Sequence, residues 1–281
     1  MSNKKILFTI DLEQDLSKYI DNSYLGMEQA TKVLENAFVE SNVEALYFTT
    51  ADIANRYPEF IRSAFQRNGV IGNHGMDHSV QYYCLKNYNW QLAEIRKSTE
   101  IISKIAGASP TAFRAPNFSV NGDTIKALIE SDYSMDSSVI PGVTLSRYRM
   151  FKIFDFSLAP TKRYWPDEND VSLEGSQRKL LELPIATVEH TGGTPIGMGM
   201  LNHRGLEKAV ELACTSALDP VQFIIHPWEL VALRESYPKL RPWVADACKD
   251  SVDTLRMFIA RISKVMEIVN PRELINEIQG R

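Results

Sequence analysis

The sequence predicts an α/β protein whose parallel strands form a single barrel with helices on the outside. Short β-rich runs alternate with helical patterns, which is typical of a parallel sheet covered by helices. There are about seven such strand–helix units. The sequence lacks the glycine-rich dinucleotide-binding fingerprint that is typical of an open sheet, so a barrel is favoured. The length of 281 residues suits an α/β barrel built as one domain.

Apolar runs that end at turn or polar residues mark the strands. The first run, residues 5–10, follows two lysines and leads at once into carboxylates. It is too short for the apolar core of a signal peptide, so a buried first strand is the better interpretation. The expected strands cover residues 5–10, 45–49, 70–71, 111–114, 133–136, 180–188 and 221–225.

Helices are predicted where apolar residues recur every three to four positions. Pro58 breaks the second of them, and Asn68-Gly69 ends it. From residue 141 to 175 this regularity lapses, and aromatic residues between 148 and 165 are a candidate substrate wall. The expected helices cover residues 27–39, 51–68, 90–105, 123–130, 206–218, 252–268 and 271–278.

Composition excludes several partners. The formal net charge is −4, so the chain has no global attraction to nucleic acid. No apolar run approaches the length of a membrane span. The cysteines Cys84, Cys214 and Cys248 form no CxxC pair, which favours a reducing cytoplasm. We expect one cytoplasmic domain over residues 1–281, with a C-terminal helical extension from about residue 250.

Reactive side chains fall where the predicted strands end. In a βα barrel these ends meet on one face, which carries the active site. Residues far apart in the sequence are therefore expected to share one pocket. The strand-end residues are Asp11, Glu13, His74, His78, Arg114, Asp136 and His226.

Two of these histidines have the spacing of metal ligands. His74 and His78 are four residues apart, so on a helix both imidazoles would face one ion. A carboxylate is the expected third ligand, because catalytic zinc sites combine three protein ligands with water. The spacing alone is equally consistent with a metal site and with two unrelated surface histidines. The nearby acids Asp11 and Glu13 favour the metal site.

Three further residues suggest proton transfer. His226 leaves a buried strand just before Pro227 and suits a general acid. Asp136 is expected to orient its imidazole. Arg114 is expected to pair with Asp11, and the turn after Arg114 offers backbone N–H groups for an oxyanion hole. Purely structural roles, a core histidine and an internal ion pair, are the alternatives.

Five short motifs then form one pattern. They are Thr9-Ile10-Asp11-Leu12-Glu13, Ile71-Gly72-Asn73 before His74 and His78, Arg114-Ala115-Pro116, Asp136-Ser137-Ser138, and His226-Pro227-Trp228-Glu229. Together they resemble the polysaccharide deacetylases, the NodB-homology group of carbohydrate esterase family 4, over residues 5–230. The resemblance implies a distorted (β/α)7 barrel and metal-dependent hydrolysis of an N-acyl group on an amino sugar.

The resemblance also implies a role for each motif residue. His74 and His78 would bind the metal with a carboxylate, and Asp11 would be the base. His226 would protonate the leaving amine. Arg114 would steady Asp11, and Asp136 would steady His226. Pro116, Asn117 and Trp228 would contact the substrate, the Asn117 N–H at the oxyanion.

The first motif departs from the family pattern, which is usually Thr-Phe-Asp-Asp. Here Asp11 and Glu13 flank Leu12. Residues i and i+2 of a strand point to the same side, so both carboxylates reach the pocket. We assign Glu13 to the metal, with Asp11 as the alternative ligand. This spacing resembles a subgroup that includes lipid-linked formamido-sugar deformylases.

The expected substrate is therefore a sugar nucleotide or a lipid-linked sugar of surface-glycan biosynthesis that carries an acetyl or formyl group. The membrane would be contacted only through a lipid-linked substrate. The expected metal is Zn²⁺, with Co²⁺, Ni²⁺, Mn²⁺ and Fe²⁺ as competitors. Two other functions stay open: an allantoinase-like hydrolase of small cyclic amides, and a non-catalytic glycan-binding protein.

Overall fold

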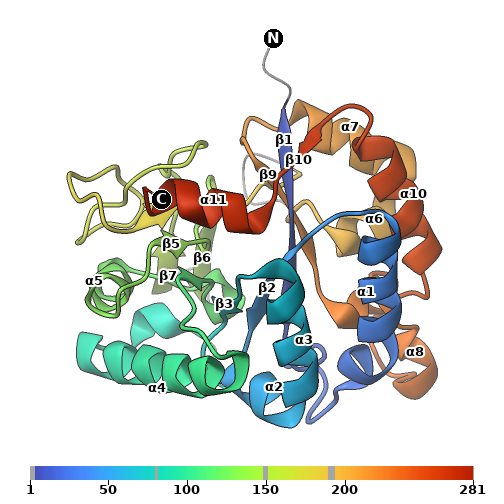
Figure 1. Cartoon of the computed structure of the whole chain (residues 1–281), viewed down its shortest axis with the longest axis horizontal. Coiled ribbons are helices and arrows are strands. Elements are labelled where there is room, and N and C mark those ends of the chain that lie inside the picture. The colour runs from blue at the N-terminus through green and yellow to red at the C-terminus, as the bar shows by residue number, and fades with distance from the viewer. Residues whose placement is uncertain (1–3, 80–81, 148–150, 189–193, 281) are drawn as a thin grey trace.

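The computed structural model describes residues 4–79, 82–147, 151–188 and 194–280. A curled sheet of eight strands lies at its centre, with helices around it (Figure 1). Every strand pair in this sheet is parallel. The strands are β1 (Lys5–Leu12), β2 (Leu46–Thr49), β3 (Gly72–Asn73), β4 (Ala112–Phe113), β5 (Met135–Asp136), β8 (Leu181–Glu182), β9 (Val221–Ile225) and β10 (Glu267–Ile268).

The longest strand, β1, is paired along both edges. β9 pairs with residues 6–10 on one edge, and β2 pairs with residues 9–12 on the other. β10 joins β1 at Lys5 and Ile6, on the same edge as β2. Apart from β10, the strand order β9-β1-β2-β3-β4-β5-β8 is that of a seven-stranded barrel. This order confirms the predicted fold class.

The barrel is open between β8 and β9. Among the described residues no ladder joins these two strands. The Gln222 side chain crosses the gap instead, because its Nε2 donates to the carbonyl oxygens of Leu183 at 2.8 Å and Pro184 at 3.0 Å. The backbone of residues 194–197 also lies in this gap: the Ile196 N–H donates to the Ala186 carbonyl oxygen at 2.8 Å, and the Ile224 N–H donates to the Ile196 carbonyl oxygen at 3.1 Å. A buried amide and a short backbone segment together fill the seam.

Helices cover the outer face of the sheet. Side chains alternate along each strand, so one set packs under the helices and the other points into the barrel. On β1, for example, Ile6, Phe8 and Ile10 join the large outer core. The helices are α1 (Thr31–Glu40), α2 (Ala51–Arg56), α3 (Pro58–Asn68), α4 (Tyr88–Ala106), α5 (Gly122–Glu130), α6 (Met198–Arg204), α7 (Leu206–Thr215), α8 (Leu233–Ser236), α9 (Pro242–Ala245), α10 (Val252–Ile262) and α11 (Pro271–Ile278).

The interior of the barrel is apolar at the amino ends of the strands. Leu274 and Ile275 of α11 pack onto this layer and close that end of the barrel. The layer that they cover contains Leu7, Leu46, Phe48, Ala112, Met135 and Leu183. The C-terminal segment is thus part of the barrel, and the site must lie at the opposite, carboxyl end.

Most predicted elements are present, and β9 and α11 have the predicted bounds. The helix predicted over residues 252–268 is wrong in its last part: α10 ends at Ile262, and Glu267–Ile268 form β10. β10 pairs with the start of β1, and such a distant pairing leaves no local signal. The irregular stretch contains a hairpin of β6 (Thr144–Arg147) and β7 (Phe151–Asp155).

None of the described helices combines the length and the apolar composition that crossing a bilayer requires.

Closure of the barrel by α11 can be tested with Leu274→Ala. We expect a loss of about 2–4 kcal/mol in the free energy of unfolding, because the side chain is 5% exposed and its removal opens a cavity. Urea denaturation measures the effect. Glu273→Ala, at an exposed position of the same helix, is the control and should change stability by less than about 0.5 kcal/mol. Equal stability of both variants would contradict the packing role of α11.

Candidate active site

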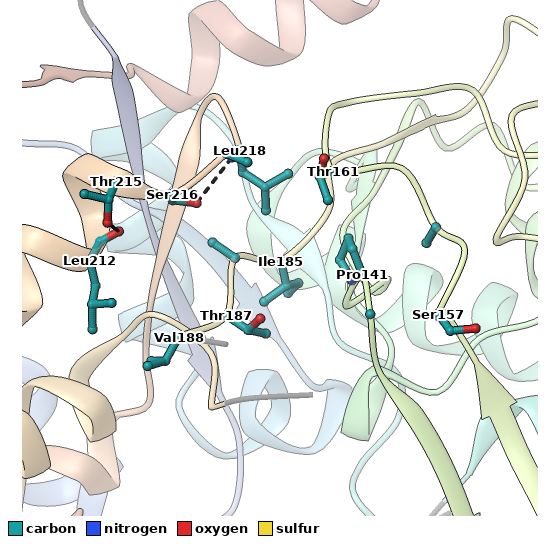
Figure 2. A pocket seen from close by; sticks show the side chains of 14 residues that line it. Pro141, Ser157, Thr161, Ile185, Thr187, Val188, Leu212, Thr215, Ser216 and Leu218 are labelled. Atoms are coloured by element: carbon teal, nitrogen blue, oxygen red, sulfur yellow. Dashed lines mark hydrogen bonds between the residues drawn. The ribbon is translucent and has the colours of Figure 1, made fainter. Parts of the chain in front are cut away.

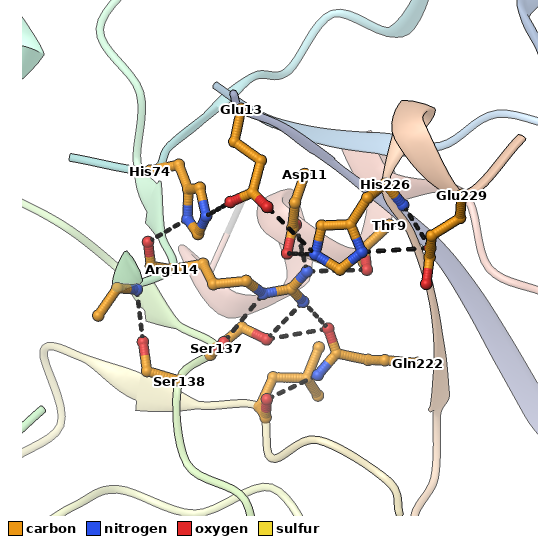
Figure 3. A network of polar contacts seen from close by, with 12 residues as sticks. Thr9, Asp11, Glu13, His74, Arg114, Ser137, Ser138, Gln222, His226 and Glu229 are labelled. Atoms are coloured by element: carbon orange, nitrogen blue, oxygen red, sulfur yellow. Dashed lines mark hydrogen bonds and ion pairs between the residues drawn. The ribbon is translucent and has the colours of Figure 1, made fainter. Parts of the chain in front are cut away.

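The alternation of side chains along the strands assembles the candidate site. Leu7, Thr9, Asp11 and Glu13 follow each other at intervals of two along and just beyond β1, so they share the interior face. Gln222, Ile224 and His226 repeat this pattern along and just beyond β9. Polar residues thus lie above the apolar layer, at the carboxyl end of the barrel (Figure 3).

Glu13, His74 and His78 form one cluster. Their ligand atoms all lie within 4.8 Å of one another. His74 Nε2 is 3.2 Å from Glu13 Oε2 and 3.3 Å from His78 Nε2, and His78 Nε2 also contacts Glu13 Oε2. Two imidazoles and one carboxylate are the donor set of a catalytic zinc site with one open position. The cluster therefore fits a divalent metal.

The protein fixes the orientation of these side chains. His74 Nδ1 donates to the carbonyl oxygen of Arg114 at 2.7 Å, which leaves the lone pair of Nε2 for a metal. His78 Nδ1 lies 3.2 Å from Ser17 Oγ. The indole N–H of Trp228 donates to Glu13 Oε1 at 3.2 Å. Outer partners of this kind hold ligands in place before an ion binds.

Glu13 and the two histidines shift each other's pKa values. Burial alone would raise the pKa of Glu13, but the nearby His78 and His74 outweigh burial and lower it well below its usual range. Burial alone would lower the pKa of His78, but Glu13 outweighs burial and raises it. The carboxylate is therefore held in its charged form.

Asp11 occupies a separate position beside this cluster. Its Oδ1 accepts from Arg114 Nη1 at 2.6 Å, and both side chains are almost fully buried. Its Oδ2 is buried, has no hydrogen-bond partner and lies 3.7 Å from His226 Nε2. The expected Arg114–Asp11 pair is thus present in the geometry, and it leaves one carboxylate oxygen available.

His226 is oriented by Glu229. The Glu229 Oε2 accepts from the backbone N–H of His226 at 2.8 Å and lies 3.2 Å from its Nδ1. Burial by itself would lower the pKa of His226, but Glu229, Glu13 and Asp11 together raise it to about 9. The imidazole also stacks on Trp228, with ring centroids 4.6 Å apart. At neutral pH it is therefore a proton donor.

The expectation that Asp136 orients His226 is wrong. Met135 and Ser137 point into the barrel, so Asp136 between them points out of it, beside Glu182 on the neighbouring strand β8. Burial raises the pKa of Asp136 to about 6 and, together with the Asp136 charge, raises that of Glu182 well above its usual range. Burial and the neighbouring Asp136 charge thus favour the neutral form of the Glu182 carboxyl.

Asp136 instead supports the turn after β4. Its Oδ1 accepts from Ser138 Oγ at 2.6 Å, and the same hydroxyl accepts from the Ala115 N–H at 2.9 Å. Ala115 leads into the turn that contains Asn117 and Phe118, whose φ values are 54° and 56°. Two consecutive non-glycine residues in the left-handed region are costly, and such strain is concentrated at functional sites.

A pocket of about 210 Å³ opens onto the cluster. Asn117 and Trp228 line it, as expected for substrate contacts. Pro116 does not: it is buried against Gly75, where a Cβ would lie 3.2 Å from its ring. The lining residues are Asp11, Glu13, Leu16, Ser17, Lys18, Tyr19, His74, His78, Asn117, Phe118, His226 and Trp228.

The expected aromatic wall is also wrong for the described part of residues 148–165, because none of these residues lines this pocket. Residues 148–150 lie outside the described residues. The loop after β1 provides the wall instead, with Tyr19 as its aromatic member. Neither this loop nor Glu229 was predicted, although the acid three residues after His226 was visible in the sequence.

A second cavity, of about 170 Å³, has no lining residue in common with this pocket; Figure 2 shows its wall. Its wall contains hydroxyl side chains, among them Ser157, Thr161 and Thr215, together with apolar ones such as Leu212. No described residue of this wall carries a titratable group. This cavity therefore offers no acid–base group among its described lining residues.

The family resemblance is confirmed by comparison with known proteins. Residues 4–135 match the family model described as polysaccharide deacetylase. Over this first part of the chain, the sequence is therefore similar to the polysaccharide deacetylases. No curated protein matches the chain.

Solved structures confirm the fold over nearly the whole chain. A protein from Mycobacterium smegmatis, described as a candidate polysaccharide deacetylase, is 17% identical with a TM-score of 0.63, and the match covers 99% of this chain and 91% of that one. The carbohydrate esterase domain of a xylanase from the hindgut metagenome of Trinervitermes trinervoides is 13% identical with a TM-score of 0.54, covering 99% and 92%. A family 4 pseudoenzyme from Bacillus anthracis is 12% identical with a TM-score of 0.55, covering 98% and 66%.

Orientation of His226 can be tested with Glu229→Gln. Removing the carboxylate that stabilises the imidazolium should lower the His226 pKa from about 9 by about one unit or more. NMR titration of the histidines in metal-free protein measures the shift. Asp136→Asn is the matched control and should leave this pKa unchanged, because Asp136 faces out of the barrel. If Asp136→Asn lowered the His226 pKa and Glu229→Gln left it unchanged, Asp136 would be the partner of His226 after all.

Proposed function

We propose that the protein is a metal-dependent hydrolase that removes an N-acyl group, acetyl or formyl, from an amino sugar. One observation carries this proposal: a cluster of two imidazoles and a carboxylate opens onto a pocket beside an unpartnered acid oxygen and a histidine held by Glu229. The match of residues 4–135 to polysaccharide deacetylases supports the same reaction.

Glu13, His74 and His78 would hold the metal, for which Zn²⁺ is the first candidate and Co²⁺, Ni²⁺, Mn²⁺ and Fe²⁺ are competitors. When bound, such a metal supplies Lewis acidity toward the acyl carbonyl and lowers the pKa of water. In this assignment the longer Glu13 side chain is the ligand, because it contacts both histidines, whereas Asp11 is held by Arg114.

The chain's own residues move the protons. Asp11 Oδ2 accepts a proton from the attacking water, while Arg114 holds Oδ1 and fixes the orientation of the carboxylate. His226 gives its Nε2 proton to the amine nitrogen as the C–N bond breaks, while Glu229 holds the imidazole. The products are the free acid and the amine. The N–H of Asn117 is the proposed donor to the carbonyl oxygen.

The proposed substrate is a sugar nucleotide or a lipid-linked sugar in surface-glycan biosynthesis, and the proposed location is the cytoplasm. A solved structure that is 14% identical to this chain, with a TM-score of 0.55, is described as the Bc1960 peptidoglycan N-acetylglucosamine deacetylase. An N-acetylglucosamine derivative is therefore a suitable first substrate. Hydrolysis of cyclic amides such as allantoin is the second substrate class to assay. A non-catalytic glycan-binding role would appear as binding without acid release.

The metal site can be tested with His74→Ala. We expect loss of near-stoichiometric divalent metal, measured by elemental analysis, and a fall of at least about a hundredfold in the release of acetate or formate. His203→Ala changes an exposed histidine of α6 and should retain both metal and activity. Undiminished hydrolysis by His74→Ala would refute the proposed function.

The two carboxylates of the first motif can be separated with Asp11→Asn and Glu13→Gln. Asp11→Asn should retain the metal and lose about 10²–10⁴-fold in kcat, because it removes only the base. Glu13→Gln should lose the metal. Elemental analysis and acid release are measured on both variants, and metal bound to Asp11→Asn also shows that this variant folds. If instead Asp11→Asn lost the metal and Glu13→Gln retained it, Asp11 would be the ligand.

A further inference from the structure

Two buried carboxyl groups lie on the outer face of the sheet, and the proposed reaction does not use them. Asp136 on β5 and Glu182 on β8 are paired in register on neighbouring parallel strands, so their side chains lie on the same face. Both residues are fully buried. No described lysine, arginine or histidine forms an ion pair with either of them. We call these two residues the acid pair.

Each member of the acid pair binds the following turn through one carboxyl oxygen. Glu182 Oε1 accepts from the backbone N–H groups of Ser138 at 3.2 Å and Val139 at 3.0 Å. Asp136 Oδ1 accepts from the Ser138 hydroxyl. The acid pair thus holds residues 137–139, which we call the β5 turn. The other two oxygens, Asp136 Oδ2 and Glu182 Oε2, are buried and have no hydrogen-bond donor, which is a costly arrangement.

One proton between the two carboxyls would satisfy both of these oxygens, because the two side chains lie within hydrogen-bonding reach of each other. Two other groups face the pair. Burial raises the pKa of Asp136 to about 6 although the Arg114 charge lowers it, and the Arg114 guanidinium is already bound to Asp11. Burial and the nearby acids raise the pKa of Tyr164, so its O–H keeps its proton and donates to the Val171 carbonyl oxygen. Neither group neutralises a second negative charge.

The β5 turn connects the acid pair with the candidate site. The Ser137 carbonyl oxygen accepts from Arg114 Nε at 3.0 Å, and the Ser137 hydroxyl accepts from Arg114 Nη2 at 2.9 Å (Figure 3). The Ser138 hydroxyl accepts from the N–H of Ala115, which leads into the turn with the proposed oxyanion donor. Arg114 in turn holds Asp11, the proposed base. A chain of contacts through the β5 turn therefore runs from the acid pair to the base.

We propose that Asp136 and Glu182 share one proton, and that Glu182 is thereby a positioning residue for the proposed base. The Glu182 carboxyl donates this proton to Asp136 and accepts from the β5 turn, so the turn stays closed on Arg114. When the proton is lost to solvent, two negative charges face each other and the pair no longer holds the turn. The shared proton is independent of the reaction, whereas the positioning role rests on the proposed function.

The shared proton can be tested with Glu182→Gln, whose amide donates to Asp136 without a titratable proton. The unfolded chain releases both protons above pH 4.5, but the folded wild-type protein keeps one, so its stability falls as the pH rises. From about pH 6 to pH 7, the unfolding equilibrium constant of the wild type should rise about tenfold relative to that of Glu182→Gln. Urea denaturation measures both constants. Glu174→Gln, at an exposed position, is the control and should follow the wild type.

Infrared spectroscopy gives a second measurement, which does not depend on the folding of a variant. At neutral pH the wild-type protein should show the carbonyl stretch of a neutral carboxyl group, and this band should be lost in Glu182→Gln. Stability profiles of the wild type and Glu182→Gln that run parallel, or a wild-type spectrum without a neutral carboxyl group, would overturn the shared proton.

The positioning role can be tested with Glu182→Met, which keeps the volume of the side chain but removes its polar atoms. Because the β5 turn loses its support, the Arg114 Nε–H should exchange with solvent at least about tenfold faster than in the wild type, as measured by NMR. Glu182→Gln keeps an acceptor and a donor, so it should restore the wild-type exchange rate. Unchanged exchange in Glu182→Met would overturn the positioning role.

Turnover of an N-acetylglucosamine derivative by the metal-loaded protein gives the functional readout. In Glu182→Met, kcat should fall by about tenfold or more while KM stays nearly unchanged, because the base is displaced but the pocket is intact. Glu182→Gln should restore kcat. If the exchange rate of Arg114 responds as expected but the wild type hydrolyses no derivative, the proposed function fails and the link from the acid pair to Arg114 stands. Equal kcat in the wild type and Glu182→Met would refute positioning of the base.

Discussion

The buried guanidinium of Arg114 is the interaction on which the rest of the structure depends. It donates to Asp11 Oδ1, to Thr9 Oγ1 at 3.0 Å and to Gln222 Oε1 at 2.7 Å, and it lies 4.3 Å from the centre of the Phe48 ring. A buried charge is costly unless it is paired and hydrogen-bonded. Here the charge joins β1, β4 and β9 across the inside of the barrel.

The same residue connects stability with chemistry. Its carbonyl oxygen fixes the imidazole of His74, and its side chain fixes Asp11. Through Gln222 it also reaches the open seam between β8 and β9. A shift of this one residue would therefore disturb the proposed base, a proposed metal ligand and the closure of the barrel together.

The strands and helices that show a local periodicity of apolar residues, and the residues at the strand ends, could be predicted from the sequence. The ends of the parallel strands identified Asp11, Glu13, His74 and His226, since strand direction brings these ends to one face. It did not predict which way Asp136 points, because a strand of two residues has no alternation to read. It also missed β10 and the wall at Tyr19, since both depend on partners far away in the chain.

The position of β10 has a consequence for how the protein forms. Within the part of the chain that the structure describes, the start of β1 pairs only with β9 and β10, and both are synthesised long after it. Until β9 and β10 have been synthesised, the apolar residues Ile6, Leu7 and Phe8 at the start of β1 therefore lack these strand partners, although β2 can already pair with residues 9–12.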